Sequence, residues 1–242
     1  MGHAVITIPN FPACGFGNQA LYYNNMRQLA AQKGCGFSCP SWDGADVFDV
    51  PLYKRTETEV KILDFCLGSK YHDYKTVSTR DVFVLKDNLD PYYRTCSIHI
   101  RETDFHSWMP EAVEIAQRVG YYQNSVVELL DHVDKFIIFT DDPTSWRIKE
   151  IIETLEYHKK QYTFGQNTSD RSKFANDFIE MSRCEYMISS PSTFNIVAGM
   201  TGINKKIIHS KDWINYRREK NDLFWIRLVD SSDDDYRIWK LV

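Results

Sequence analysis

The sequence of 242 residues contains no apolar run long enough to cross a lipid bilayer, and its start lacks a charged segment followed by an apolar stretch. A membrane span needs roughly 20 apolar residues, and a secretory signal needs both features of that start. Cysteine is present, but its spacing matches no zinc-binding pattern. We therefore expect a cytoplasmic protein with free thiols and no membrane span. The cysteines are Cys14, Cys35, Cys39, Cys66, Cys96 and Cys184.

The sequence also lacks an excess of basic residues and any credible cluster of metal ligands. Its formal net charge is -4, whereas a nucleic-acid-binding surface requires a basic stripe or patch. The short acidic run from Asp233 to Asp235 is typical of a solvated segment, because adjacent carboxylates repel each other. We therefore predict no nucleic-acid partner and no metal cofactor.

What the sequence does contain is an alternation of strand-like and helix-like segments. This alternation predicts βαβ units and an α/β fold with parallel sheets. We place a smaller lobe at residues 1–94 and a larger one at 95–242. Strands are predicted at Ala4–Pro9, Thr95–Ile100, Lys135–Thr140, around Tyr162, and at Tyr186–Ser189 and Lys206–His209. Helices are predicted at Gln19–Gln32, Glu57–Leu67, within Glu111–Glu128 with a break near Gly120, at Ser145–Glu156 with Thr144 as its cap, and at Lys173–Arg183 and Thr193–Met200.

Polar residues follow several of these strands, and open parallel sheets bind ligands beyond the carboxyl ends of their strands. After the first strand, Gly15, Gly17, Asn18 and Gln19 open a helix. Glycines let the backbone pass close to a ligand, and a helix N-terminus favours an anionic group. An ordinary strand-to-helix turn explains the same residues equally simply.

The second strand ends in His99 and Arg101, which alternate along the strand and so point to the same side. An arginine can hold a phosphate through two parallel, charge-assisted hydrogen bonds. The alternative is an ion pair between Arg101 and either Glu102 or Asp104. The spacing alone does not separate these two interpretations.

The third strand is followed by Asp141 and Asp142, either of which could accept hydrogen bonds from a ribose or a base, or cap the next helix. Adjacent side chains in an extended segment point opposite ways, which disfavours a shared metal ion. Ser192, Thr193 and Phe194 open a later helix. Hydroxyls at a helix start suit an anion site, although helix capping explains them as well.

Taken in order, these segments resemble the α-1,2-fucosyltransferase family and, more loosely, the wider fucosyltransferase superfamily. The resemblance extends over roughly Ala4 to Ile208. The family patterns G-x-L-G-N-Q, H-x-R-R-x-D, F-S-D-D followed by Trp, and S-T-F correspond here to G-F-G-N-Q at Gly15–Gln19, H-I-R-E-T-D at His99–Asp104, F-T-D-D at Phe139–Asp142 with Trp146, and Ser192–Phe194.

The resemblance implies a GT-B-like enzyme of two Rossmann-like lobes, with the acceptor in the first and the nucleotide-sugar donor mainly in the second. It implies an inverting, metal-independent transfer of L-fucose from GDP-fucose to a glycan hydroxyl. It also implies that Arg101 binds the donor diphosphate. The other residues that it assigns to the donor are Ser192, Thr193, Phe194 and, less directly, Asp141 or Asp142. To these donor-binding candidates we add the turn residues Gly15, Gly17, Asn18 and Gln19.

Glu102 departs from the family pattern, which has arginine at this position. If Glu102 faces the ligand, its charge favours another donor, such as UDP- or dTDP-L-rhamnose. A non-catalytic carbohydrate-binding protein on the same scaffold is a further alternative. For the general base that accepts the proton of the acceptor hydroxyl, the sequence offers Glu102, Asp104 and His99.

Overall fold

The computed structural model describes residues 5–7, 11, 15–49, 59–61, 83–86, 90–166, 174–202, 206–222 and 238–242. The chain divides into two compact units, Met1–Asn88 and Leu89–Val242. Each unit has its own parallel sheet, which confirms the predicted α/β class with parallel sheets. The division precedes strand β4 (Tyr92–Ile100), whereas the boundary expected from the sequence lies inside that strand.

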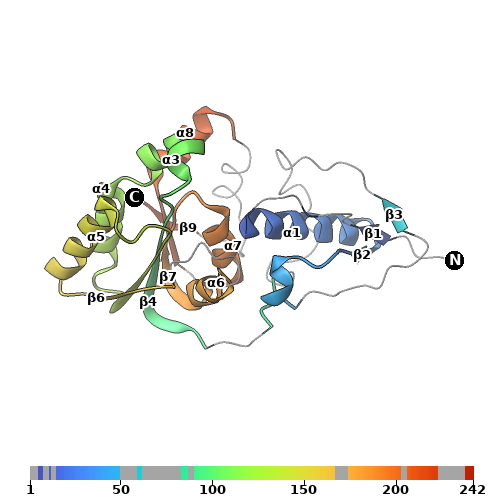
Figure 1. Ribbon diagram of the computed structural model, residues 1–242, viewed down its shortest axis with the longest axis horizontal. Helices are drawn as coiled ribbons and strands as arrows, with labels where there is room; N and C mark the ends of the chain where they lie inside the picture. The colour runs from blue at the N-terminus through green and yellow to red at the C-terminus, as the bar shows by residue number, and fades with distance from the viewer. Residues whose placement is uncertain are drawn as a thin grey trace. The chain divides into compact units, whose positions relative to one another are not determined.

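In its described residues, the first unit has a three-stranded parallel sheet of order β2-β1-β3, a long helix and a short 3₁₀ turn (Figure 1). The helix ends where Gly34 adopts a positive φ of 63°, a backbone conformation that glycine reaches without strain. The helix predicted over Glu57–Leu67 is wrong where it overlaps β3, and its other residues lie outside the described ones. The elements are β1 (Val5–Thr7), α1 (Phe16–Gln32), β2 (Gly36–Ser38), η1 (Asp43–Asp46) and β3 (Glu59–Lys61).

Aromatic side chains supply much of the first unit's core. Trp42 stacks on Tyr23 with ring centroids 5.1 Å apart, and Tyr23 meets Phe37 edge-on at 5.3 Å. Such ring pairs add about 0.5–1.5 kcal/mol each beyond the burial of their area. Packing in this unit therefore explains part of the aromatic content of the sequence, which is 14%.

The second unit contains a six-stranded sheet of order β6-β5-β4-β7-β8-β9, with every neighbouring pair parallel. From β4 the chain runs outward through β5 and β6, and then crosses to the other side for β7, β8 and β9. The order therefore reverses between β4 and β7. The other strands are β5 (Lys135–Thr140), β6 (Gln161–Phe164), β7 (Cys184–Ile188), β8 (Lys206–His209) and β9 (Ile238–Leu241).

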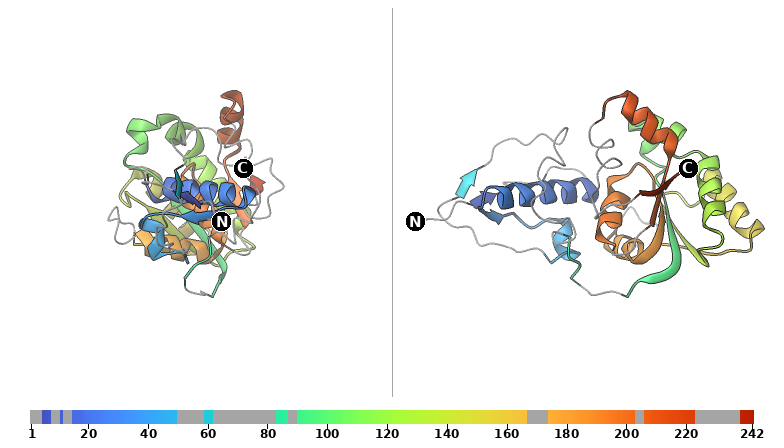
Figure 2. Two further views of the ribbon diagram at one scale, coloured as in Figure 1. Left: turned by 90° about the vertical axis from the view of Figure 1, so that its right-hand side faces the viewer. Right: turned by 180° about the vertical axis from the view of Figure 1, so that it is seen from behind.

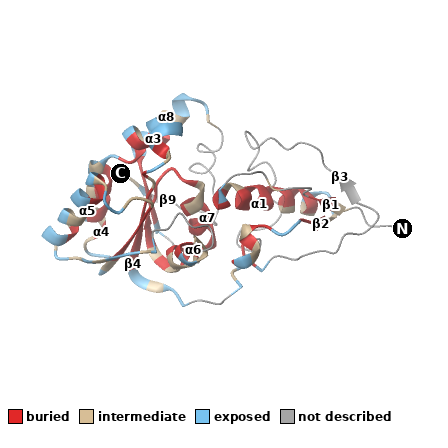
Figure 3. Ribbon diagram, in the orientation of Figure 1, coloured by how far each residue is buried: buried red, intermediate tan, exposed pale blue. Residues whose placement is uncertain are grey.

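Helices cover both faces of this sheet, with α4 and α5 on one side and α6 and α7 on the other (Figures 1 and 2). Cys96, Ile98 and Ile100 of β4 belong to a buried core that also contains residues of α4 and α5 (Figure 3). His99, between them in the strand, stacks instead on Phe194 of α7. The helical elements are α3 (Phe105–Trp108), η2 (Ala112–Ala116), α4 (Val119–Leu129), α5 (Trp146–Tyr157), α6 (Phe174–Arg183), α7 (Thr193–Thr201) and α8 (Lys211–Glu219).

Two local predictions in the second unit are wrong. The break in the segment 111–128 falls at Gln117 and Arg118, between the π-helical turn η2 and α4, while Gly120 lies inside α4. The cap of α5 is Ser145, whose hydroxyl accepts a hydrogen bond from the Ile148 N–H; Thr144 is instead held by Asp142. The predicted strands over β5 and β8 match the structure residue for residue.

None of the helices in the described parts of the chain combines the length and apolar character needed to cross a bilayer. Four of the six cysteines are described, and all four are free thiols. Cys14, Cys66 and the acidic run Asp233–Asp235 lie outside the described residues.

Candidate functional site

The strand order of the second unit reverses at the carboxyl ends of β4 and β7, and crevices at such reversal points are where open α/β sheets bind ligands. Three candidate residues from the sequence analysis follow strands that end at this edge: Arg101 after β4, Asp141 after β5 and Ser192 after β7. The fold therefore brings to one edge of one sheet groups that are up to 91 residues apart in the chain.

His99 joins the two strands at this point. Its Nδ1 lies 2.6 Å from the Ser190 Oγ, just beyond β7, and its ring stacks on Phe194 of α7 with centroids 5.8 Å apart. Burial, followed by the charge of Arg101, lowers the pKa of His99 to about 3. The imidazole is therefore neutral near pH 7, and it orients its neighbours rather than carrying charge.

The buried neutral state of His99 predicts acid sensitivity. The folded-state pKa is depressed, so between about pH 6.5 and 3 the unfolded chain binds a proton that the folded chain does not. The contribution of His99 to the free energy of unfolding is therefore fully present above pH 6.5. It falls as pH is lowered, by up to about 1.4 kcal/mol per pH unit. Urea unfolding of the wild type and His99→Gln at several pH values measures this dependence; an equal change of unfolding free energy with pH in both chains would rule out the linkage.

Arg101 is held by carboxylates at the edge of the sheet. Its Nε and Nη2 donate to the two oxygens of Asp104 at 2.7 and 2.8 Å, and its Nε lies 3.3 Å from the Asp141 Oδ2. This pairing raises the pKa of Arg101 and lowers that of Asp104. The side chain remains 38% exposed, and its Nη1 bonds to none of the described residues. The ion pair foreseen with Asp104 thus exists, yet one edge of the guanidinium can still bind an anion.

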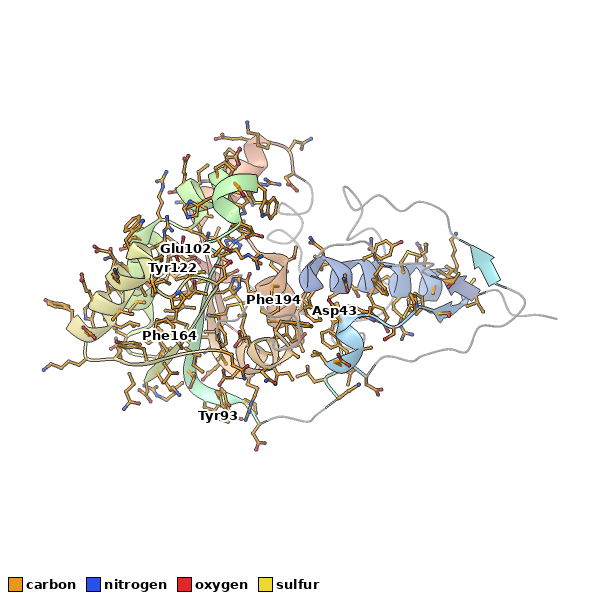
Figure 4. All side chains as sticks on the ribbon, in the orientation of Figure 1. Asp43, Tyr93, Glu102, Tyr122, Phe164 and Phe194 are labelled. Atoms are coloured by element: carbon orange, nitrogen blue, oxygen red, sulfur yellow. The ribbon has the colours of Figure 1, made fainter. Side chains whose placement is uncertain are left out.

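Glu102 points away from this edge and into the protein. Both of its carboxylate oxygens accept from Arg147 Nη1 at 2.7 Å, and both side chains are nearly inaccessible to solvent, at 4% and 7% exposure. Ser145 donates to the same carboxylate at 3.1 Å, and His106 lies 3.0 Å from it. Figure 4 shows Glu102 near Tyr122 of α4, on the side of the sheet away from Phe194. The charge that departs from the family pattern is therefore neutralised internally.

The two adjacent aspartates have separate partners. Asp141 accepts from the backbone N–H of Glu102 at 2.6 Å and from the Thr103 hydroxyl at 2.6 Å, which fixes the segment after β4. Asp142 accepts from the backbone N–H and the hydroxyl of Thr144, and these bonds lower its pKa. Within the described stretches, no three acidic, histidine or cysteine side chains gather as a metal site would require.

The start of α7 retains the features of an anion site. Ser192 occupies the N-cap position, but its hydroxyl does not cap the helix. Phe194 packs against His99 and against Phe178 of α6, with ring centroids 5.6 Å apart in the second pair. Thr193 and Phe194 are half-buried, so the first turn of α7 reaches solvent beside the ends of β4 and β7.

The glycine-rich segment of the sequence analysis lies in the first unit. Gly15 precedes α1, and Gly17, Asn18 and Gln19 form its first turn. The Gly15 carbonyl accepts from the N–H groups of Asn18 and Gln19 at 3.0 and 3.2 Å, and Gly15, as the N-cap residue, has no side chain that could cap the helix. A Cβ added to Gly15 would meet nothing within 4 Å, so the turn leaves open space there.

Sequence reasoning missed two residues that hold the site, Gln117 and Arg147. Both are buried and polar, and each bonds to the segment that begins at Arg101. Arg147 sits beside the Trp146 that was noted after the paired aspartates, so its position could have been suspected. Nothing in the sequence marks Gln117.

Comparison with known proteins identifies one family. The sequence model of glycosyl transferase family 11 matches residues 69–227, which is most of the chain. That match contains the segments at His99, Asp141 and Ser192. No curated protein sequence matches the chain.

Three solved structures resemble this fold. POFUT1 in complex with GDP aligns with 81% of this chain and 68% of its own, at 11% identity and a TM-score of 0.42. POFUT1 in complex with GDP-fucose aligns with 81% of this chain and 69% of its own, at 10% identity and a TM-score of 0.42. The dodecameric iron-containing heptosyltransferase TibC in complex with ADP-D-beta-D-heptose aligns with 99% of this chain and 62% of its own, at 12% identity and a TM-score of 0.45. At these scores, none of the similarities assigns a ligand or a catalytic residue to this chain.

Proposed function

The chain belongs to glycosyl transferase family 11, and from this premise we propose that it transfers L-fucose from GDP-fucose to a glycan hydroxyl, with inversion at the anomeric carbon and without a metal. The observation that carries the proposal is the reversal of strand order between β4 and β7. At that point an arginine with one unbonded edge lies on the same side of the sheet as the uncapped start of α7.

The connection between Arg101 and α7 runs through His99. His99 lies two residues before Arg101 in the chain, and its ring stacks on Phe194. The Arg101 guanidinium is near enough to contribute to the lowered pKa of His99. In the proposed complex, a diphosphate bound by the Nη1 edge of Arg101 also meets the first turn of α7, whose backbone N–H groups and dipole favour negative charge.

In the proposed reaction, the oxygen of the acceptor hydroxyl forms a bond to the anomeric carbon. The bond from that carbon to the diphosphate oxygen breaks, and its electron pair leaves with GDP. Arg101 and the start of α7 stabilise the charge that develops on the leaving group, an effect worth about 2.7–4 kcal/mol for one well-placed donor. The proton of the acceptor hydroxyl passes to a general base.

Of the three candidate bases, Asp104 is the one whose side chain is exposed to an acceptor. Glu102 is almost inaccessible to solvent and is paired with Arg147. His99 is buried, and its Nδ1 lies 2.6 Å from the Ser190 Oγ. Asp104 is 45% exposed, and its bond to Arg101 would place an acceptor hydroxyl close to the diphosphate. We therefore assign to Asp104 the orientation of Arg101 and the role of base.

The internal pairing of Glu102 also supports a GDP-linked donor over a UDP- or dTDP-linked one, because no reversed charge faces the site. Hydrogen bonds within the protein use both carboxylate oxygens of Asp141 and one of Asp142, which supports transfer without a metal.

A thermal-shift experiment tests the donor class. We expect GDP at about 100 times its Kd to stabilise the folded chain by about 2.7 kcal/mol, since a ligand that binds only the folded state raises the melting temperature. UDP and dTDP at equal concentration should give a smaller shift, and EDTA should change neither the GDP shift nor fucose transfer. A shift with UDP or dTDP but not GDP would replace fucose by another donor, and EDTA-sensitive transfer would reinstate a metal.

A further inference from the structure

Gln117 is a buried polar residue that has no part in the proposed reaction as described so far. Its side chain is fully buried at the end of η2. The side-chain amide forms hydrogen bonds with both the N–H and the carbonyl of Arg101. The Arg101 N–H donates to the Gln117 Oε1 at 2.9 Å, and the Gln117 Nε2 donates to the Arg101 carbonyl at 2.7 Å. We call this pair of hydrogen bonds the Gln117 bracket.

The bracket continues the β4 ladder past the end of the strand. Arg101 lies one residue beyond the last residue of β4, where no neighbouring strand pairs with it. A side-chain amide presents an N–H donor beside a carbonyl acceptor, so it can form the pair of hydrogen bonds that a neighbouring strand would supply. The Tyr122 hydroxyl lies 3.2 Å from the same Oε1 and 3.1 Å from the His99 carbonyl, and links the bracket to the strand.

An irregular turn delivers Gln117 to this place. The Gln117 N–H donates to the Ala112 carbonyl at 3.0 Å, a bond across five residues that gives a π-helical turn. Such turns are rare and often occur at functional sites, because an α-helical continuation would aim the side chain elsewhere. The helical structure is interrupted here, at Gln117 and Arg118, before α4 begins.

We infer that Gln117 is a positioning residue, which fixes the backbone of Arg101 so that the free edge of its guanidinium meets the diphosphate of the donor. The inference rests on the proposed function. It accounts for a polar side chain in a buried place next to Arg101. Misplacing a catalytic group by about 1 Å can cost about 100-fold in rate.

The decisive variant is Gln117→Glu. A protonated glutamic acid keeps one donor and one acceptor and can form the same bracket, whereas the ionised form has two acceptors and opposes the Arg101 carbonyl. Burial raises the pKa of such a carboxyl above its ordinary value of about 4.3. The variant should therefore transfer fucose within about 3-fold of wild type at low pH, and lose about 10- to 100-fold in kcat as pH rises.

Gln117→Met cannot form the two hydrogen bonds of the bracket and should transfer fucose slowly at every pH. Gln161→Glu is the control, because it makes the same change at the exposed start of β6. The folded fraction of each variant is followed by circular dichroism at the assay pH. A Gln117→Glu profile that parallels wild type in the folded chain would overturn the inference. So would a loss that equals the unfolded fraction, because Gln117 would then only support folding.

Binding of inorganic pyrophosphate, measured by calorimetry, separates this inference from the proposed function. If wild type binds pyrophosphate but transfers no fucose from GDP-fucose, the proposed donor fails while the bracket is still tested. In that case the Kd for pyrophosphate should rise about 10-fold or more in Gln117→Met. An unchanged Kd in the folded variant would overturn the bracket's role.

Discussion

Replacing Arg101 with alanine is expected to lower kcat for sugar transfer by about 100- to 1,000-fold, the loss that follows removal of one well-placed donor to a developing charge. The fold should survive, because Arg101 is 38% exposed and the Asp104 that it leaves behind is 45% exposed. Arg101→Lys keeps the charge but loses the planar fork, so it should recover only part of the activity. Initial rates with GDP-fucose and a glycan acceptor measure these effects.

A matched control lies at the other end of the same strand. Arg94 also pairs with an aspartate, Asp134, through its Nε at 2.7 Å, but it is far from the carboxyl end of β4. Arg94→Ala should leave kcat close to that of wild type. If Arg101→Ala turns over at a near-normal rate, or if both alanine variants lose activity equally, Arg101 does not bind the diphosphate.

Much of the second unit could be predicted from sequence because its central strands are largely buried, as the burial of β5 and β7 shows. Runs such as Lys135–Thr140 and Lys206–His209 are apolar on both faces, and the structure has strands over the same residues. The β9 strand and the reversal of strand order could not be predicted in this way, since periodicity says nothing about which strands are neighbours. The first unit was harder to predict because its strands are only three residues long.

The candidate site was predictable as a set of segments but not as a set of contacts. The sequence placed Arg101, Asp141 and Ser192 after strands, and parallel topology then brought them to one edge. It left open whether Arg101 pairs with Glu102 or with Asp104, because both are within three residues. The choice depends on Arg147, which lies 45 residues from Glu102 in the chain and neutralises it. Long-range partners of this kind leave no local pattern.

Removing one partner of the Glu102–Arg147 pair should have the largest effect on stability. Both side chains are almost fully buried, so Arg147→Met leaves the Glu102 carboxylate with only Ser145 and His106. Breaking a buried ion pair in this way costs about 3–5 kcal/mol. The double variant Glu102→Leu with Arg147→Met removes both charges, and it should recover most of that loss because no buried ion remains. Urea unfolding of the singles and the double gives the coupling between the two positions.

The same variants decide whether Glu102 selects the donor nucleotide. If Glu102 faced the ligand, Glu102→Gln would change the preference between GDP and UDP and cost little stability. A carboxylate buried against Arg147 requires the opposite outcome: the free energy of unfolding falls while the GDP-to-UDP ratio in thermal-shift measurements stays as in wild type. The exposed ion pair of Arg94 and Asp134 provides the reference for the loss of stability, since Asp134→Asn should change the free energy of unfolding little. A changed nucleotide preference in a stable Glu102→Gln chain would return Glu102 to the donor site and reopen the choice of sugar.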